Sequence, residues 1–317
     1  MLAIVCPGQG AQKPGFLTPW RELPGTNEAL AALSAPAGID LLRHGTESDA
    51  DTLRDTAVAQ PLLVAAGIVA AAALYQEEGL PAADAFAGHS VGELTAAALG
   101  GVLSNEDAMR LVAVRSQAMA RAAAAEPTSM AAVVGGVRED VVAAIEGHGL
   151  HAANINSAAQ VVAAGSAAQI AALAEDGPAK ARVIPLQVAG AFHTPYMAGA
   201  REDLAAFAPS LTPHDPSVPL ISNAGGEVVG SGARYLELIV DQVASPVDWE
   251  ACMATLRDRG ITAMIEVAPA GTLTGLAKRE LKGIALANLN TPDDLDAARA
   301  LVREHAGTAA AHADQEN

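Results

Sequence analysis

The motif Gly-His-Ser-Val-Gly at residues 88–92 constrains the fold of this chain more than any other feature. An apolar run at residues 85–87 precedes it and a helical pattern at residues 93–99 follows it, which predicts a sharp turn from a strand into a helix. Such a turn lifts the side chain of Ser90 out of the sheet, and the helix start offers free backbone N–H groups, such as that of Val91, to a developing oxyanion. The same motif also occurs as a plain glycine turn, so by itself it leaves the two interpretations equal.

The chain as a whole alternates short apolar runs with helical patterns, which predicts an α/β fold with a parallel sheet. Residues 2–6, 218–221 and 261–267 are expected to form strands of its core. A turn at residues 269–271 is expected to lead into the last core helix. Residues 305–317 are mostly small and polar, and we expect them to form a frayed tail.

The segment from about residue 128 to residue 189 has an order of its own. Its expected elements are a strand at 130–134, a helix at 139–146, a hairpin of strands at 152–156 and 160–164, a helix at 167–174 and a strand at 182–188. This βαββαβ order is typical of ferredoxin-like folds. We therefore expect a hydrolase-like parallel-sheet core, formed by residues 1–125 and 190–317, with a small ferredoxin-like subdomain inserted at residues 126–189.

A long helix is predicted from Ser104, which begins it in the manner of a capping box with Asp107, to about residue 124. Arg115 falls on the apolar face of this helix, in line with Met119. A buried guanidinium group must find an anion. That anion is either an internal Asp or Glu, which the sequence alone slightly favours, or a substrate carboxylate held by two parallel hydrogen bonds.

A serine nucleophile needs a base, and among the eight histidines His193 is the strongest candidate. It follows the predicted strand at 182–188 and precedes a helix that starts at Thr194 and Pro195. We therefore expect it at the C-terminal end of a strand, where the sites of α/β proteins form. The alternative is an ordinary loop histidine beside a helix. His148 and His151 have a helical spacing but no third ligand nearby, so no metal site is predicted.

A glycine-containing loop, Pro-Gly-Gln-Gly-Ala-Gln at residues 7–12, follows the first predicted strand. It does not fit the dinucleotide fingerprint, because Lys13 stands where the third glycine is required. The loop is either a plain turn or a device that brings a backbone N–H group close to a reacting carbonyl.

Composition excludes several classes of function. Lys and Arg number 19 against 36 Asp and Glu, for a net charge of −17, which argues against nucleic acid and against an anionic membrane surface as partners. The two cysteines, Cys6 and Cys252, cannot form a disulfide framework, so a reducing, cytoplasmic compartment is expected. The longest apolar run, residues 61–75, is shorter than the roughly 18 residues of a spanning helix and is interpreted as a buried helix.

Taken together, these motifs resemble the malonyl-CoA:acyl carrier protein transacylase family, whose relatives include the acyltransferase domains of polyketide and fatty acid synthases. The resemblance spans nearly the whole chain. It is carried by segments 6–12, 60–61, 88–93, 154–157, 190–193, 245–247 and 266–269 and by Arg115 with Met119. The chain departs from the family pattern at Cys6, where Phe is frequent, at Ala11, where Ser is frequent, and at residues 268–270, where the family turn is richer in glycine.

The resemblance implies a catalytic role for five residues. Ser90 would be the nucleophile and His193 its base. The backbone N–H groups of Gln9 and Val91 would bind the oxyanion. Gln242 matches the position whose oxygen orients the histidine in place of a triad carboxylate, although the local match at residues 241–244 is loose.

The resemblance also implies a binding site for the acyl group. Arg115 would hold the malonyl carboxylate, with Met119 beside it on the same helix. Asn156 matches a position near the acyl pocket, in the small subdomain. Phe192, in the sequence Ala-Phe-His at residues 191–193, would crowd out an α-methyl branch and so favour malonyl groups.

The activity implied is a ping-pong transfer of the malonyl group from malonyl-CoA to the phosphopantetheine thiol of holo acyl carrier protein, in fatty acid or polyketide synthesis. No metal or redox cofactor is implied, and a free-standing, monomeric enzyme is expected. A serine hydrolase, a CoA-binding subunit without activity and the malonyl transferase of a malonate decarboxylase are the alternatives. Because carrier proteins of this kind are acidic, docking requires a local basic patch, either Lys180 with Arg182 or Lys278 with Arg279 and Lys282.

Overall fold

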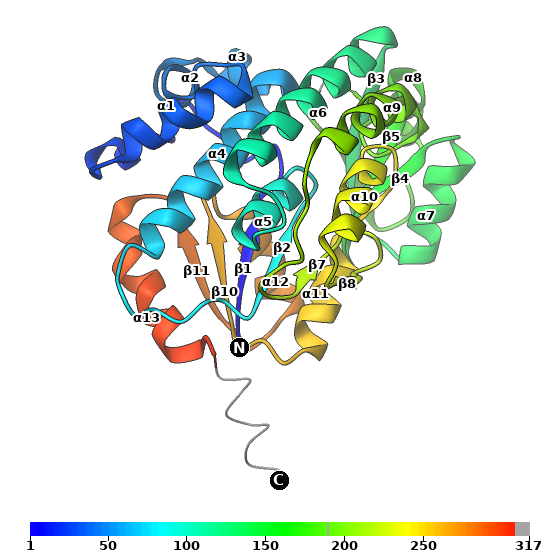
Figure 1. The fold of residues 1–317 in the computed structure, drawn as a ribbon. Helices are drawn as coiled ribbons and strands as arrows, with labels where there is room; N and C mark the ends of the chain where they lie inside the picture. Colours follow the sequence, from blue (N-terminus) through cyan, green and yellow to red (C-terminus); the bar gives the residue numbers. More distant parts are fainter. Residues whose placement is uncertain (189, 308–317) are drawn as a thin grey trace.

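A six-stranded sheet forms the centre of the chain, and the computed structural model describes residues 1–188 and 190–307 (Figure 1). The strand order is β11-β10-β1-β2-β7-β8, in which only β7 and β8 pair antiparallel. Its strands are β1 (Leu2–Cys6), β2 (Ala85–Gly88), β7 (Leu220–Ile221), β8 (Val228–Val229), β10 (Ala263–Val267) and β11 (Ala285–Leu289). The predicted mixed α/β fold is therefore confirmed, with strands at each of the expected core positions.

The central strand β1 is buried along its whole length and packs its side chains alternately on the two faces of the sheet. Leu2 and Ile4 belong to a core shared with α4 (Thr56–Leu74), α5 (Gly92–Leu99) and α6 (Asn105–Ala125). Ala3 and Val5 contact a separate core shared with α11 (Trp249–Asp258) and α12 (Thr272–Glu280). Helices on both faces explain why the strand is a continuous apolar run and does not alternate with polar residues.

Helices of the first half of the chain lie on the first of these faces (Figure 1). They are α1 (Thr26–Ala37), α2 (Leu41–Glu47), α3 (Ala50–Arg54), α4 (Thr56–Leu74), α5 (Gly92–Leu99) and α6 (Asn105–Ala125), with a short 3-10 helix at Pro19–Glu22. The predicted helix cap is present, since the Ser104 side chain accepts a hydrogen bond from the backbone N–H of Asp107, while the Asp107 carboxylate pairs with Arg110.

Helix α4 is longer than the apolar run that predicted it, because it begins at Thr56 with Asp55 as its cap. Within the described residues it is the one helix whose length and composition would allow it to cross a membrane, and 83% of its most apolar window is buried inside the protein. It therefore occupies the place of a core helix, as the sequence predicted.

The second half of the chain supplies the remaining helices, which are α9 (Ala198–Phe207), α10 (Gly232–Gln242), α11 (Trp249–Asp258), α12 (Thr272–Glu280) and α13 (Leu295–His305), with 3-10 helices at Pro195–Met197, Ala208–Ser210 and Pro292–Asp294. Strand β11 and helix α13 correct the prediction that the helix after residue 271 is the last of the core, because α13 packs against α4 and the sheet. Helix α13 ends at His305, and residues 308–317 of the predicted tail lie outside the described residues.

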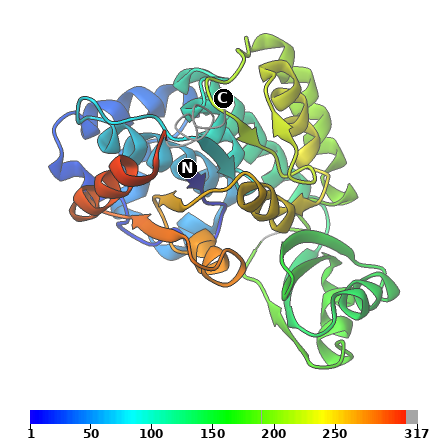
Figure 2. The ribbon, with the colours of Figure 1, turned by 90° about the horizontal axis from the view of Figure 1, so that it is seen from below.

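A second sheet of five strands lies to one side of the main sheet (Figure 2). Its strand order is β6-β3-β5-β4-β9, and all its pairs are antiparallel except β4 with β9. Its elements are β3 (Thr128–Gly135), α7 (Arg138–Gly147), β4 (His151–Ser157), β5 (Gln160–Ser166), α8 (Ala167–Glu175), β6 (Ala181–Pro185) and β9 (Val247–Asp248). The order from β3 to β6 is the predicted βαββαβ order.

Two features of this second sheet differ from the prediction. Strand β6 ends at Pro185 rather than at residue 188, and one further hydrogen bond, from the Leu186 N–H to the Met130 carbonyl, continues past its end. The edge strand β9 comes from the distant second half of the chain and pairs with β4, which the sequence order gives no means of foreseeing. This pairing and an ion pair between Arg138 of α7 and Glu250 of α11 join the second sheet to the rest of the chain.

Candidate active site

Ser90 stands on the turn between β2 and α5 with a φ of 54°, in the left-handed region that few residues other than glycine adopt. The flanking glycines make this turn possible. A Cβ atom on Gly88 would come within 2.0 Å of the backbone carbon of Gly92, and one on Gly92 would come within 2.1 Å of the carbonyl oxygen of Cys6. The strained turn and its lack of space for side chains favour a functional serine over a plain glycine turn.

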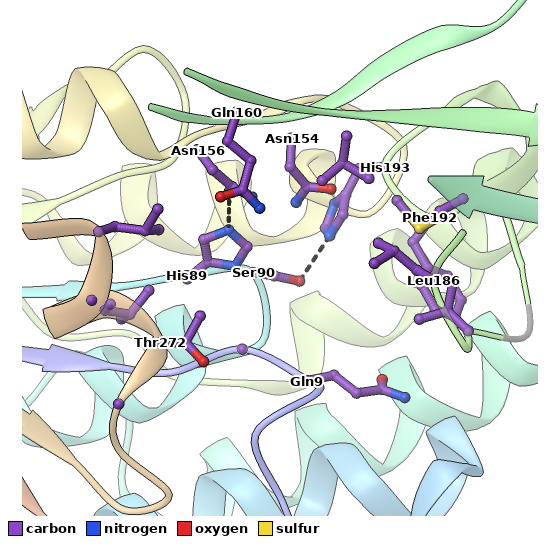
Figure 3. A pocket seen from close by; sticks show the side chains of 18 of the residues that line it. Gln9, His89, Ser90, Asn154, Asn156, Gln160, Leu186, Phe192, His193 and Thr272 are labelled. Atoms are coloured by element: carbon purple, nitrogen blue, oxygen red, sulfur yellow. Dashed lines mark hydrogen bonds between the residues drawn. The ribbon is translucent and has the colours of Figure 1, made fainter. Parts of the chain in front are cut away.

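His193 lies within hydrogen-bond distance of the serine. Its Nε2 atom is 2.8 Å from Ser90 Oγ (Figure 3). Its Nδ1 atom is 2.8 Å from the carbonyl oxygen of Gln242. A carbonyl oxygen only accepts, so Nδ1 carries the proton and the lone pair of Nε2 faces the serine. Burial and the nearby Arg115 lower the pKa of His193 to about 3, so that the ring is a neutral base.

The structure corrects the argument by which His193 was selected. The preceding strand β6 belongs to the second, antiparallel sheet and ends eight residues earlier, so His193 is not at the end of a parallel strand. It stands in a loop with a φ of 61°. Two hydrogen bonds hold this loop, one from the Ala191 N–H to Thr128 Oγ1 and one from Thr194 Oγ1 to the Ala191 carbonyl.

Gln242 contributes its main chain and its side chain to different partners. The oxygen that faces His193 is the main-chain carbonyl, at the C-terminal end of α10. The side-chain oxygen accepts a hydrogen bond of 2.9 Å from Arg115 Nη2. A serine hydrolase would place a carboxylate beside the histidine, and among the described residues no hydrogen bond or ion pair joins His193 to an Asp or Glu.

Arg115 is fully buried on α6, as its place on the apolar face predicted. Its guanidinium group donates to Gln60 Oε1 at 2.6 Å, to Gln242 Oε1 at 2.9 Å and to Ser90 Oγ at 3.3 Å. No ion pair within the described residues includes Arg115, so the internal carboxylate that the sequence slightly favoured is not in contact with it. A buried cation that only neutral oxygens contact, beside a serine hydroxyl, is suited to a carboxylate ligand.

The backbone N–H groups of Gln9 and Val91 are unpaired among the described residues and can donate to an oxyanion. In the described part of the chain neither group donates to another protein atom. Val91 is the N-cap of α5, where the helix dipole favours negative charge. The loop that contains Gln9 lies against the serine turn, because the His89 N–H donates to the Cys6 carbonyl at 2.9 Å and a Cβ atom on Gly8 would come within 2.9 Å of the His89 carbonyl.

A cavity of about 370 Å³ opens above Ser90 between the two sheets. Figure 3 shows Asn154, Asn156 and Gln160 reaching into it from the second sheet, with Gln9 and Thr272 on the opposite side. Other predicted residues, Met119 and Phe192, line it as well. Asn156 is held there by a hydrogen bond of 2.9 Å between its Oδ1 and His89 Nε2.

Sequence reasoning missed two polar residues beneath the serine. Asn223 Oδ1 accepts a 2.8 Å hydrogen bond from the Ser90 N–H, and its Nδ2 donates to the Gly88 carbonyl at 2.6 Å. Glu93 is buried on α5 and accepts from the Asn223 N–H at 2.7 Å. Asn223 is the second residue after strand β7, and a polar residue just after a core strand is the signal that would have identified it.

The arrangement brings together a hydroxyl, a neutral imidazole, two free N–H groups and a buried cation. These are the components of acyl transfer through a serine ester. The described residues contain no cluster of three His, Cys, Asp or Glu side chains that could hold a metal ion.

Comparison with known proteins identifies the family. Residues 3–309 match the family described as "Acyl transferase domain". The malonyl CoA-acyl carrier protein transacylase of Mycolicibacterium smegmatis is 50% identical over 285 residues, which cover 89% of this chain and 98% of the relative. The chain belongs to the malonyl-CoA:acyl carrier protein transacylase family. It is an acyltransferase, and the family resemblance read from its motifs is confirmed.

Solved structures of this family have the same fold. A crystal structure of MCAT from Mycobacterium tuberculosis matches with a TM-score of 0.87 and 46% identity, covering 93% of this chain and 98% of that one. A malonyl-transacylase in complex with its type II PKS acyl-carrier protein matches with a TM-score of 0.88 and 28% identity, covering 94% of this chain and 99% of that one.

Proposed function

We propose that this chain transfers the malonyl group of malonyl-CoA to the phosphopantetheine thiol of a holo acyl carrier protein, through a malonyl ester of Ser90. The names of its relatives support both substrates. The observation that carries the proposal is the position of Arg115, whose Nη2 atom lies 3.3 Å from the serine hydroxyl and whose guanidinium contacts no carboxylate among the described residues. An acyl-CoA that bears a free carboxylate fits this cation, and an acetyl group does not use it.

In the first half-reaction, His193 Nε2 takes the proton of Ser90 while Oγ attacks the thioester carbonyl. The N–H groups of Gln9 and Val91 bind the oxyanion, and each such donor is worth about 3–4 kcal/mol. When the tetrahedral intermediate collapses, the C–S bond breaks, the proton on His193 passes to the departing CoA thiolate and the serine ester remains. Arg115 holds the malonyl carboxylate throughout.

In the second half-reaction, His193 takes the proton of the carrier's thiol, which attacks the ester carbonyl. The C–O bond to Ser90 breaks, and the same proton returns to Oγ. The main-chain carbonyl of Gln242 keeps the imidazole in one tautomer during both steps, because it accepts the proton of Nδ1 at 2.8 Å. Phe192 and Met119 shape the acyl pocket, and Asn156 forms its wall on the side of the second sheet.

We interpret the architecture as a hydrolase-like core, residues 1–125 and 190–317, with a ferredoxin-like subdomain at residues 126–189. The two half-reactions proposed need no metal or redox cofactor. We also propose that the chain is monomeric and cytoplasmic and supplies malonyl units to fatty acid or polyketide synthesis.

For the carrier we propose a docking surface at the C-terminal end of α12 and the turn that follows it. Arg279 lines the cavity, and Lys278 and Lys282 are its neighbours in sequence. None of these three residues forms an ion pair within the described part of the chain, whereas Arg299 and Arg303 elsewhere on the surface both do. A cation that lines the cavity and two exposed lysines near it in sequence complement an acidic carrier. Lys278→Glu with Lys282→Glu is expected to raise the KM for the carrier and leave that for malonyl-CoA unchanged, and an unchanged carrier KM would contradict the proposal.

The overall activity is tested by incubating catalytic amounts of the protein with malonyl-CoA and a holo carrier protein. The proposal predicts a carrier mass increased by one malonyl group, and no increase with Ser90→Ala. Release of CoA and free malonate without a loaded carrier would identify a hydrolase instead.

A further inference from the structure

A buried carboxylate lies next to the site but takes no part in the chemistry proposed above. Glu93 is only 1% exposed and stands in the first turn of α5, three residues after the serine. It does not line the cavity. Its Oε1 atom accepts the 2.7 Å hydrogen bond from the Asn223 N–H, and its Oε2 atom accepts from the side-chain Nε2 of Gln242. Burying a charged carboxylate costs free energy unless it is paired, so the buried position of Glu93 needs a structural or functional explanation.

The side chain of Gln242 connects this carboxylate to Arg115. The Nε2 atom of Gln242 faces three acceptors, which are Glu93 Oε2, the Ser90 carbonyl at 3.1 Å and Asn223 Oδ1 at 3.1 Å. The amide is thereby fixed with its oxygen toward Arg115 Nη2, at 2.9 Å. If the amide turned over, its NH2 group would face the guanidinium, donor against donor.

The charges of Glu93 and Arg115 support the same arrangement. Glu93 and Arg115 are not hydrogen-bonded to each other, yet the charge of each favours the charged form of the other: against the effect of burial, Arg115 lowers the pKa of Glu93, and Glu93 raises the pKa of Arg115. The other titratable groups near Glu93 are Tyr235 on α10, whose hydroxyl is 3.5 Å from the Glu93 carbonyl, and the buried thiol of Cys252 on α11. Burial and Glu93 raise the pKa of both groups, so they stay neutral and Arg115 is the charged partner of Glu93.

We infer that Glu93 is a positioning residue, which acts through the Gln242 side chain to hold Arg115 beside Ser90 and so selects acyl groups that carry a carboxylate. The inference rests on the proposed function, in which Arg115 binds the malonyl carboxylate. The path from Glu93 to Arg115 does not include the imidazole of His193, because the main-chain carbonyl of Gln242, and not its side chain, holds the histidine.

Glu93→Gln tests the inference with an almost unchanged shape. A glutamine offers one oxygen to two donors, the Asn223 N–H and the Gln242 NH2, so the Gln242 amide must turn or lose a partner. We expect kcat/KM for acylation of Ser90 by malonyl-CoA to fall about 10- to 100-fold, the size of one lost charge-assisted hydrogen bond. Acylation by acetyl-CoA and labelling by a neutral fluorophosphonate are expected to stay within about threefold, and Glu93→Asp should restore part of the malonyl rate.

A parallel Arg115→Met variant distinguishes a failure of this inference from a failure of the proposed function. If Arg115→Met lowers the malonyl preference and Glu93→Gln does not, the inference is wrong and the proposed function stands. If Arg115→Met leaves the preference unchanged, the proposed role of Arg115 is wrong and the inference falls with it. Equal losses of malonyl, acetyl and fluorophosphonate reactions in Glu93→Gln would show a purely structural residue and overturn the inference.

The wild-type protein provides a second measurement that does not depend on folding of a variant. Burial raises the pKa of Glu93 to about 7, so its carboxylate is charged above that pH and neutral below it. The preference for malonyl-CoA over acetyl-CoA is therefore expected to fall as the pH drops through about 7, while fluorophosphonate labelling stays level. A malonyl preference that is constant from about pH 5 to 9 would overturn the inference.

Discussion

Replacement of Arg115 by alanine separates carboxylate recognition from the rest of the site. In the free enzyme the guanidinium contacts only neutral oxygens, those of Gln60, Gln242 and Ser90. A malonyl carboxylate held by two charge-assisted hydrogen bonds gains about 1.5–3 kcal/mol from each, or about 3–6 kcal/mol together. Arg115→Ala is therefore expected to lower kcat/KM for Ser90 acylation by malonyl-CoA roughly 10²- to 10⁴-fold.

The acetyl group provides the internal control for this prediction. It has no carboxylate, so it loses only the 3.3 Å contact between Arg115 Nη2 and Ser90 Oγ, worth about 1 kcal/mol or about fivefold in rate. The assay is rapid-quench mass spectrometry of the acylated protein with each CoA ester, with thermal unfolding to show that the variant is folded. Arg115→Lys keeps the charge but not the planar fork and should lie between the two. Equal losses for malonyl and acetyl groups would refute the reasoning.

Three further predictions follow from the geometry of the site. Gly92→Ala should lower the melting temperature and abolish fluorophosphonate labelling of Ser90, because the added Cβ atom would lie 2.1 Å from the Cys6 carbonyl oxygen. Labelling of this variant at the wild-type rate would show that the turn does not require a glycine at this position. Phe192→Ala should increase acylation by methylmalonyl-CoA relative to malonyl-CoA about tenfold in a rate comparison, since the ring lines the cavity, and an unchanged ratio would show that this ring does not exclude the branch. Because burial lowers the pKa of His193 to about 3, the base is already deprotonated at higher pH, and the rate of fluorophosphonate labelling should be level from about pH 5 to 8. A rise in that rate centred near the ordinary histidine pKa of about 6.5 would contradict the lowered pKa.

Local sequence signals predicted much of the fold. The strand at residues 2–6 and the turn at residues 88–92 were predicted because their apolar runs and glycines act within a few residues. Arg115 was placed correctly on a buried helix face, since helical periodicity fixes the face without knowledge of the partner.

Features that depend on distant segments were not predictable in this way. The edge strand β9 pairs with β4 although more than 90 residues separate them, and two residues of strand leave no periodicity to detect. The strand position predicted for His193 is wrong, because β6 pairs antiparallel with β3 in the second sheet and ends eight residues before the histidine.

The polar groups beneath Ser90 also depend on contacts between distant segments of the chain. Asn223 acts on Ser90 over a separation of 133 residues, and Glu93 acts through a glutamine 149 residues away. The place of Asn223 after a core strand indicates a site residue but not its partner, and Glu93 looks like an ordinary first-turn residue of a helix, so only the folded arrangement gives each its partner. The division of Gln242 into a main-chain acceptor for His193 and a side chain for Arg115 is likewise invisible without coordinates.

In the reaction proposed here, Ser90 carries the malonyl group between the two half-reactions. The most direct measurement is the intact mass of the protein after brief exposure to malonyl-CoA, with Ser90→Ala in parallel. The account predicts a gain of one malonyl group that is absent in the variant and is removed by a holo carrier protein. An unmodified wild-type mass, or the same gain in Ser90→Ala, would contradict it.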